Sequence, residues 1–181
     1  MRVISGLLKG RKLNTPRNYD IRPTTDKVKE AVFSMLIPYI DEDTVFADIF
    51  AGSGGIGIEA ISRGASKVYF SDSSRESLSL VRENLQYCGV SDKAILLLGD
   101  FKQNIKRIRE DVDIYFLDPP YADGYVLPAL EAIDISGNAK SGCIAVCEHS
   151  FRDKLPEEAY GFKLIKDKKY GSIGVSLYER I

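Results

Sequence analysis

A glycine-rich turn between a predicted strand and a predicted helix constrains the fold more than any other part of the sequence. From Asp48 to Gly57 the order is Asp-Ile-Phe-Ala-Gly-Ser-Gly-Gly-Ile-Gly, and Gly52, Gly54 and Gly57 have the G-x-G-x-x-G spacing. The first two glycines allow a tight turn and close approach of a ligand, and the third lets helix and strand pack closely. The segment therefore predicts a ligand-binding α/β unit, although the same spacing is also typical of dinucleotide sites.

Strand and helix patterns alternate along the chain after this turn. The predicted strands cover residues 45–50, 67–71, 94–98, 112–117 and 143–148, and the predicted helices cover 55–63, 75–87, 101–108 and 125–133. Two further strands, 162–168 and 173–178, surround Tyr170-Gly171. Because parallel strands need long crossover connections, this order predicts a Rossmann-like α/β fold. We expect a mostly parallel seven-stranded sheet with an antiparallel edge strand.

The chain before this series is predicted to form a hairpin and a helix. Residues 2–5 and 11–14 are predicted to be short strands, joined through a turn that contains glycine, and so to form an N-terminal β-hairpin extension. Residues 26–37 are predicted to be a helix, because apolar side chains recur there at helical spacing. Pro38 disfavours continuation of this helix.

Positive charge is concentrated near the start of the sequence. Residues 1–30 contain eight Lys or Arg and three Asp or Glu, although the whole chain has a formal net charge of −1. A local basic segment is typical of proteins that bind a polyanion, and the alternative is an ordinary solvated surface. The length of 181 residues favours one domain, with a basic extension over residues 1–22 and a catalytic core over residues 23–181.

A carboxylate lies at or near the end of each of three successive predicted strands. Asp48 is near the end of the first strand, Asp72 ends the second, and Asp100 follows the third, next to Phe101. In an open α/β sheet the carboxyl ends of the strands border the ligand crevice. The first acid would repel a pyrophosphate but attract an amine, the second suits ribose hydroxyls, and the third suits an adenine amino group.

This order of amine, ribose and adenine favours S-adenosylmethionine over a dinucleotide as the cofactor. The predicted cofactor site adds the turn itself to these acids and Phe101, namely Phe50, Ala51, Gly52, Ser53 and Gly54. Each acid also has a structural explanation: Asp48 as a loop cap, Asp72 as a turn residue and Asp100 as a helix N-cap. A nicotinamide-dependent oxidoreductase is the alternative enzyme for such a sheet.

The tetrapeptide Asp118-Pro119-Pro120-Tyr121 directly follows the predicted strand 112–117. Its prolines fix φ and remove two N–H donors, so the loop is stiff and the carbonyls of Asp118 and Pro119 face outward. These carbonyls can accept hydrogen bonds from an exocyclic amino group while Tyr121 covers a flat base. A strand-ending proline turn without chemistry is the structural alternative.

The cysteines, the histidine and the apolar runs of the sequence do not indicate a metal centre or a membrane protein. Three cysteines, Cys88, Cys143 and Cys147, lie in apolar surroundings, and the single histidine is His149. This pattern favours reduced, buried thiols in a cytoplasmic protein and supplies no zinc-ligand set. No apolar run reaches the roughly 18–20 residues of a membrane span, and the start has no signal-peptide pattern.

In combination, these motifs resemble the bacterial 16S rRNA (guanine-N2)-methyltransferase family. The glycine-rich loop and Asp118-Pro119-Pro120-Tyr121 are similar to motifs of amino-group methyltransferases that use S-adenosylmethionine. Further similarities lie in residues 1–6, 9–13, 22–31, 62–65 and 169–171. In one departure, Asp72 and Ser74 stand where the family tends to have Glu and then Asp, so a second carboxylate is missing there.

The resemblance implies a class I methyltransferase fold and methyl transfer to the exocyclic N2 of a guanine in 16S rRNA. The substrate would be the naked RNA or a partly assembled small subunit, and the enzyme is expected to act as a monomer without a metal. In the catalytic loop, Asp118 and Pro119 would accept the two amino N–H bonds, Pro120 would stiffen the loop and Tyr121 would stack on the base. The expected RNA-binding residues are Arg11, Lys12, Arg22, Thr24 and Lys27.

Two further functions are compatible with the same motifs. The loop also suits an enzyme that methylates adenine N6 in DNA or in another RNA. A non-catalytic RNA-binding module that keeps this fold is the other alternative.

Overall fold

The computed structural model describes residues 1–15, 26–120 and 124–181. These residues form an eight-stranded sheet in the order β3-β2-β1-β4-β5-β8-β7-β6. The strands are β1 (Val45–Asp48), β2 (Lys67–Asp72), β3 (Ala94–Leu98), β4 (Ile114–Leu117), β5 (Ile144–Ser150), β6 (Glu158–Ala159), β7 (Phe162–Tyr170) and β8 (Ile173–Arg180). The predicted mostly parallel α/β sheet with antiparallel C-terminal strands is confirmed.

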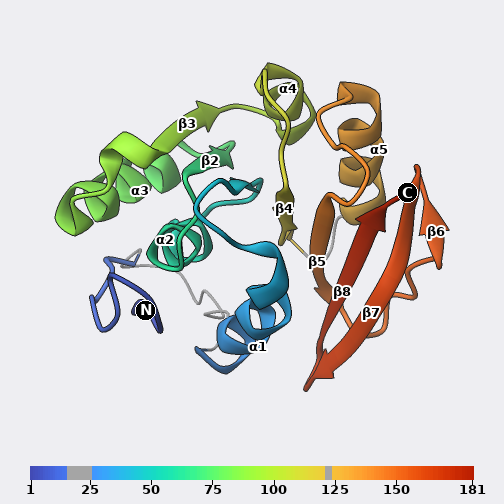
Figure 1. Ribbon diagram of the computed structural model, residues 1–181, viewed down its shortest axis with the longest axis horizontal. Helices are drawn as coiled ribbons and strands as arrows, with labels where there is room; N and C mark the ends of the chain where they lie inside the picture. The colour runs from blue at the N-terminus through green and yellow to red at the C-terminus, as the bar shows by residue number, and fades with distance from the viewer. Residues whose placement is uncertain (16–25, 121–123) are drawn as a thin grey trace.

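The first five strands are parallel, and the order of the sheet reverses between β1 and β4. The chain first adds strands outward on one side of β1, and then crosses to place β4 and β5 on the other side (Figure 1). Such a reversal leaves a crevice outside the carboxyl ends of the two central strands, because the following connections go to opposite faces. The topology therefore places a ligand site next to Asp48 and the residues after Leu117.

Helices cover both faces of the sheet. They are α1 (Asp26–Leu36), α2 (Gly55–Ser62), α3 (Arg75–Cys88), α4 (Phe101–Arg107) and α5 (Val126–Ser136), with 3₁₀ turns η1 (Ile37–Tyr39) and η2 (Ser91–Lys93). One apolar cluster lies between the sheet and α1, α2 and α3, and a second lies between the sheet and α4 and α5. Figure 1 shows the two groups of helices on opposite sides of the sheet. Strands buried on both faces explain the nearly continuous apolar runs of β1 and β4.

The glycine-rich turn connects β1 to α2 as predicted. Gly54 has φ of 79°, a left-handed conformation that favours glycine. A Cβ on Gly57 would lie 2.2 Å from a ring carbon of Phe70, a residue of β2. The third glycine of the motif therefore allows α2 to pack directly against the sheet.

The predicted number of strands is wrong, and the antiparallel part of the sheet is larger than predicted. Glu158–Ala159 forms an additional short strand, β6, which pairs with β7 and raises the number of strands to eight. Two strands run against the five parallel ones: β8, which lies between β5 and β7, and β6, which lies at the edge of the sheet. A two-residue strand has no recognisable period in the sequence, so its pairing depends on the neighbouring β7.

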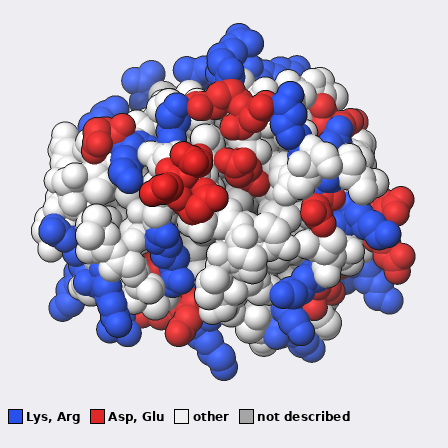
Figure 2. Space-filling view, viewed as in Figure 1, with Lys and Arg blue, Asp and Glu red and all other residues white. Residues whose placement is uncertain are grey.

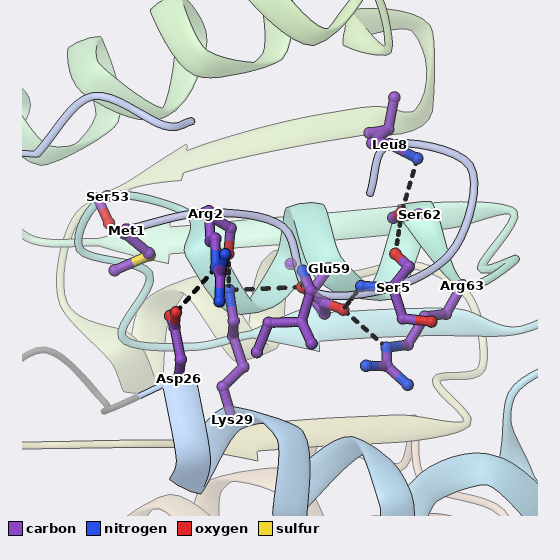
Figure 3. Close-up of polar contacts among 12 residues, drawn as sticks. Met1, Arg2, Ser5, Leu8, Asp26, Lys29, Ser53, Glu59, Ser62 and Arg63 are labelled. Atoms are coloured by element: carbon purple, nitrogen blue, oxygen red, sulfur yellow. Dashed lines mark hydrogen bonds and ion pairs between the residues drawn. The ribbon is translucent and has the colours of Figure 1, made fainter. Parts of the chain in front are cut away.

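The two strands predicted for an N-terminal β-hairpin are not formed: residues 1–15 contain an isolated antiparallel bridge between Arg2 and Lys12, with backbone hydrogen bonds from Val3 to Arg11 and from Leu13 to Met1 beside it. The backbone N–H groups of Ile4 and Ser5 donate to the Glu59 carboxylate at 2.8 and 3.0 Å instead of continuing a ladder. The next part of the segment bonds to Ser62, which also belongs to α2. Figure 3 shows the segment held along α2 by these contacts. The pairing therefore stays limited to the residues around the bridge, and the backbone beyond Val3 bonds to α2.

None of the helices in the described part of the chain combines the length and the apolar character that crossing a membrane requires.

Candidate cofactor and substrate site

The carboxyl edge of the sheet brings together the acids that the sequence analysis selected. Asp48 ends β1 and Asp72 ends β2, while Asp100 follows β3 and Asp118 follows β4. Asp48 is paired in register with Phe116 of β4, two residues before Asp118. The glycine-rich turn and the Asp118 loop therefore leave adjacent central strands on the same edge.

The acids nearest the glycine-rich turn also hold it in shape. The Gly52 N–H donates to Oδ2 of Asp72 at 2.9 Å, and the Gly57 N–H donates to Oδ2 of Asp48 at 3.1 Å. Oδ1 of Asp72 accepts from the Ser74 N–H at 2.8 Å. The structural explanations of Asp48 as a loop cap and of Asp72 as a turn residue are thus correct. They do not exclude ligand binding, because a carboxylate oxygen can accept more than one hydrogen bond.

Asp48 lies in an environment that penalises its negative charge. Its side chain is almost fully buried. Burial, together with a smaller contribution from the Asp72 carboxylate, raises the pKa of Asp48 to about 7 against the opposing effect of the Gly57 N–H. A cation placed here would relieve both penalties, so the site favours a positively charged group over a phosphate.

Aromatic side chains from the segments after β1, β3 and β4 form one side of the candidate cofactor site, near Asp100. The ring centroids of Phe50 and Phe101 are 5.3 Å apart, and those of Phe101 and Tyr125 are 5.4 Å apart. Asp100 is exposed and its Oδ1 accepts from the Lys102 N–H at 2.9 Å, so it is the predicted N-cap of α4. Tyr125 was missed by the sequence analysis. The available signal was an aromatic residue just after the Asp-Pro-Pro loop.

The Asp118 loop continues directly from the buried strand β4. Asp118 is partly exposed, Pro119 is buried and Pro120 is exposed, while Tyr121 lies outside the described residues. Burial raises the pKa of Asp118 well above its usual value, and the carboxylates of Glu148 and Asp48 raise it further. The loop therefore presents a carboxyl group with a strong tendency to hold a proton.

Glu148 is a second residue that the sequence analysis missed. The pairing of Leu117 with Cys147 places Asp118 and Glu148 at neighbouring positions of β4 and β5. Glu148 is buried, and its charge acts on Asp118. An acid at the end of an otherwise apolar strand was the signal in the sequence.

Asn84 connects the glycine-rich turn to the N-terminal segment, and it was missed because it lies on α3. Its amide donates to the Ser53 carbonyl at 2.9 Å and to the Asn14 carbonyl at 3.0 Å. Its own oxygen accepts from the Asn14 N–H at 2.8 Å. Ser53 also contacts Met1 at 3.7 Å. The start of the chain is therefore part of the support of the turn.

The basic residues expected to bind RNA are not all near Asp118. The guanidinium of Arg11 lies over the ring of Tyr87 at 5.6 Å, at the C-terminal end of α3, and this end faces the amino edge of the sheet. Lys12 is exposed on the N-terminal segment, and Lys27 is exposed in the first turn of α1. Arg22 and Thr24 lie outside the described residues.

Acidic side chains gather near the middle of the face in Figure 2, with basic side chains around them. Exposed acids precede two central strands: Asp41, Glu42 and Asp43 before β1, and Asp111 and Asp113 before β4. Lysines lie at the same edge, and Nζ of Lys140 is 3.6 Å from Oδ1 of Asp111, so charges of both signs border the amino ends of these strands.

The cysteines and the histidine have structural surroundings. Cys88, Cys143 and Cys147 are free and buried. His149 is buried, with Nδ1 2.8 Å from the Ser150 carbonyl oxygen and Nε2 2.8 Å from Oγ of Ser176. Within the described ranges, no group of three or more His, Cys, Asp or Glu side chains is arranged to hold a metal ion.

A family model described as conserved hypothetical protein 95 matches residues 1–179. The chain belongs to this family. A Haemophilus influenzae protein named Ribosomal RNA small subunit methyltransferase D is 31% identical over 99% of this chain and 93% of its own length. A Bacillus subtilis protein named "Putative rRNA methyltransferase YlbH" is 36% identical over 99% of both chains.

A solved structure supports the same relationship. An Escherichia coli protein described as "Putative methyltransferase yhhF" is 28% identical, with a TM-score of 0.89, over 99% of this chain and 97% of that chain. These matches confirm the resemblance to the 16S rRNA methyltransferase family and the class I methyltransferase fold. They also identify the chain as a methyltransferase.

Proposed function

We propose that the protein transfers a methyl group from S-adenosylmethionine to the exocyclic N2 of a guanine in 16S rRNA. The names of the full-length relatives support a small-subunit rRNA substrate, which would place the enzyme in the cytoplasm. The observation that carries the proposal is the position of Asp118-Pro119 at the end of β4, beside the glycine-rich turn where the sheet order reverses. The loop that would bind the target amino group and the turn that would bind the cofactor thus border the same crevice.

The residues of the crevice suit the functional groups of S-adenosylmethionine. Buried Asp48 would bind the ammonium group, and Asp72 would accept from the ribose hydroxyls. Asp100 and Phe101 would contact the adenine, with Tyr125 extending the aromatic wall. The turn from Phe50 to Gly54 would supply backbone groups. When bound, the cofactor supplies an electrophilic methyl group on a sulfonium.

The Asp118 loop would orient the guanine amino group. Its nitrogen is a weak nucleophile, because the lone pair is delocalised into the ring. The Asp118 carboxylate and the Pro119 carbonyl would accept its two N–H bonds and so align the nitrogen with the methyl group. Tyr121 would stack on the base, which must leave its helix or be unpaired. As the N–C bond forms and the bond between the methyl carbon and sulfur breaks, the nitrogen would release a proton to Asp118 or to water.

The proposal is tested by methyl transfer from labelled S-adenosylmethionine to protein-free 16S rRNA, partly assembled small subunits and DNA. We expect label in the RNA or the subunits, and mass spectrometry of the digested RNA should identify N2-methylguanine at one position. Label only in DNA adenine would assign the adenine alternative. Tight binding of a nicotinamide cofactor without binding of S-adenosylmethionine would overturn the proposal in favour of an oxidoreductase.

The affinity for the cofactor product S-adenosylhomocysteine should rise with pH up to about 7. The pKa of Asp48 is about 7 in the free protein, and a bound ammonium group would lower it. Binding below about pH 7 therefore releases a proton, and the dissociation constant should fall by up to about tenfold per pH unit. Calorimetry in buffers of different ionisation enthalpy measures both the affinity and the proton release.

Asp48→Asn is the matched variant for this experiment. It should weaken binding at pH 7 and remove the pH dependence, whereas Asp43→Asn, at an exposed position, should change neither. The same pKa shift makes the free protein less stable as the pH rises from about 4 to about 7, because the folded state holds the extra proton. An unchanged pH profile in Asp48→Asn would exclude the ammonium contact.

A further inference from the structure

A second basic surface lies at the opposite end of the sequence from the N-terminal segment. We call it the β7 surface, and it consists of exposed side chains of the loop after β5 and of β7. Its members are Phe151, Arg152, Lys154, Lys166, Lys168 and Lys169. They lie within residues 151–169, and the sequence analysis did not select them as a group. Lys166 and Lys168 lie on one face of β7 and Lys169 lies on the other, because successive strand residues alternate faces. Both faces border the outer edge of β7, which pairs with β6 only at Phe162 and Lys163.

The β7 surface borders the carboxyl edge of the sheet, where the Asp118 loop lies. Ser150 at the end of β5 pairs with Ile173 of β8, and Ile173 pairs with Tyr170 at the end of β7. The Phe151 N–H donates to the Ser172 carbonyl at 2.9 Å, which joins the loop after β5 to the β7–β8 turn. The loop after β5 therefore lies one strand from the proposed site of the target base, and the lysines of β7 lie two strands beyond β5 on the same side of that site.

The surface is built on a rigid support. A chain of hydrogen bonds crosses three strands, from Nε2 of His149 to Oγ of Ser176 at 2.8 Å and from Oγ of Ser176 to Oδ1 of Asp167 at 2.9 Å. A Cβ on Gly174 would lie 2.6 Å from Cε1 of His149, so a glycine is needed for the ring to lie on β8. This arrangement gives the Asp167 carboxylate a hydrogen-bond donor and connects β5, β8 and β7 on the face of β7 that carries Lys169.

The surface combines cations with an exposed aromatic ring. The side chain of Phe151 is 40% exposed, and Nζ of Lys169 lies 4.3 Å from its ring centroid. Proteins that bind single-stranded nucleic acid combine exposed aromatic rings, on which bases stack, with cations that bind the adjacent phosphates. A lysine that is only solvated needs no aromatic partner, so the contact between Lys169 and Phe151 favours a binding role.

The positive charge is confined to the carboxyl-edge half of β7. At the other end of the strand, Lys163 is paired in register with two acids, Glu158 of β6 and Glu179 of β8. Lys168 and Lys169 are instead paired with Val175 and Gly174, which carry no charge. The two ends of one strand therefore differ in the ligand that they favour.

We propose that the β7 surface binds the single-stranded RNA next to the target guanine. Lys166, Lys168, Lys169 and Arg152 would contact phosphates, and Phe151 would stack on an unpaired neighbouring base. This assignment rests on the proposed function, because it names the part of the fold that holds the RNA substrate. It adds a substrate contact that the N-terminal basic segment does not supply.

The test compares Lys168→Ala/Lys169→Ala with Lys140→Ala/Lys163→Ala, a control pair that removes the same charge from exposed positions at the amino edge. The first variant should bind an unpaired 16S rRNA fragment about tenfold or more weakly, with the slope of log K against log salt reduced by roughly one to two. Phe151→Ala should lower the affinity by about fivefold or more with an unchanged slope. The control pair should match the wild type, and all variants should bind S-adenosylhomocysteine normally.

The outcomes separate this inference from the proposed function. If the wild type neither binds nor methylates small-subunit RNA, the proposed function is wrong and the β7 assignment is wrong with it. If the wild type does both and Lys168→Ala/Lys169→Ala behaves like the control pair, only the β7 assignment is wrong. A selective loss of RNA affinity and of kcat/KM for RNA, with normal cofactor binding, supports the inference.

Discussion

Replacement of Asp118 by Ala is expected to abolish methyl transfer while leaving the affinity for S-adenosylhomocysteine within about twofold of the wild type. The variant loses the acceptor that orients the amino nitrogen, and mutations that remove one such group typically cost about 10²–10³-fold in rate. Asp118 follows β4, whereas the proposed cofactor contacts follow β1, β2 and β3. The effect should therefore appear in kcat rather than in cofactor binding.

Asp118→Asn separates the two roles proposed for this carboxylate. The amide keeps an acceptor oxygen but cannot take up a proton. Burial and the neighbouring carboxylates raise the pKa of Asp118, so wild-type activity should increase with pH as this group ionises. If Asp118→Asn keeps much of the activity and its rate no longer increases with pH, Asp118 acts by orientation and water removes the proton.

Single-turnover rates of methyl transfer, measured across pH with saturating cofactor, decide this point. Asp111→Ala is the matched control, because Asp111 is an exposed acid in the loop before the same strand. It should leave the rate unchanged. An Asp118→Ala protein with more than a tenth of the wild-type rate would contradict the assigned role.

The central part of the fold was predictable because its signals are local. The glycine spacing predicted the β1–α2 turn, and apolar runs predicted β1 and β4. The positions of Asp48, Asp72 and Asp100 at strand ends followed directly, since parallel strands of a doubly wound sheet end on one edge. Their hydrogen bonds within the turn show that structural and ligand-binding roles can coincide in one carboxylate.

The features that were missed depend on contacts between distant parts of the chain. Glu148 and Tyr125 join the site only through strand register and loop packing. The difference between Lys163 and Lys168 is invisible in the sequence, because both are lysines of one strand and only the pairing partners differ. The strands of the N-terminal hairpin were predicted too long for a similar reason: the backbone after Val3 bonds to Glu59 of α2.

Replacement of Glu59 by Gln is expected to lower the free energy of unfolding by about 3–5 kcal/mol, the usual effect of removing one partner from a buried ion pair. Glu59 is fully buried, with Nζ of Lys29 at 3.4 Å and Nε of Arg63 at 2.8 Å. Burial lowers the pKa of Lys29, and Glu59 is the charge that opposes this most strongly. The variant would leave two cations facing a neutral amide and would weaken the acceptor of two backbone N–H groups.

Urea unfolding measures this loss, and hydrogen exchange at Ile4 and Ser5 locates it, because these N–H groups donate to Glu59. Asp26→Asn is the control, since its ion pair with Arg2 is exposed and should contribute no more than about 1 kcal/mol. Faster exchange at both amides, with the central strands still protected, would show that Glu59 holds the N-terminal segment on α2. Equal stabilities of Glu59→Gln and Asp26→Asn would instead mean that the buried network contributes no more to folding than a surface pair.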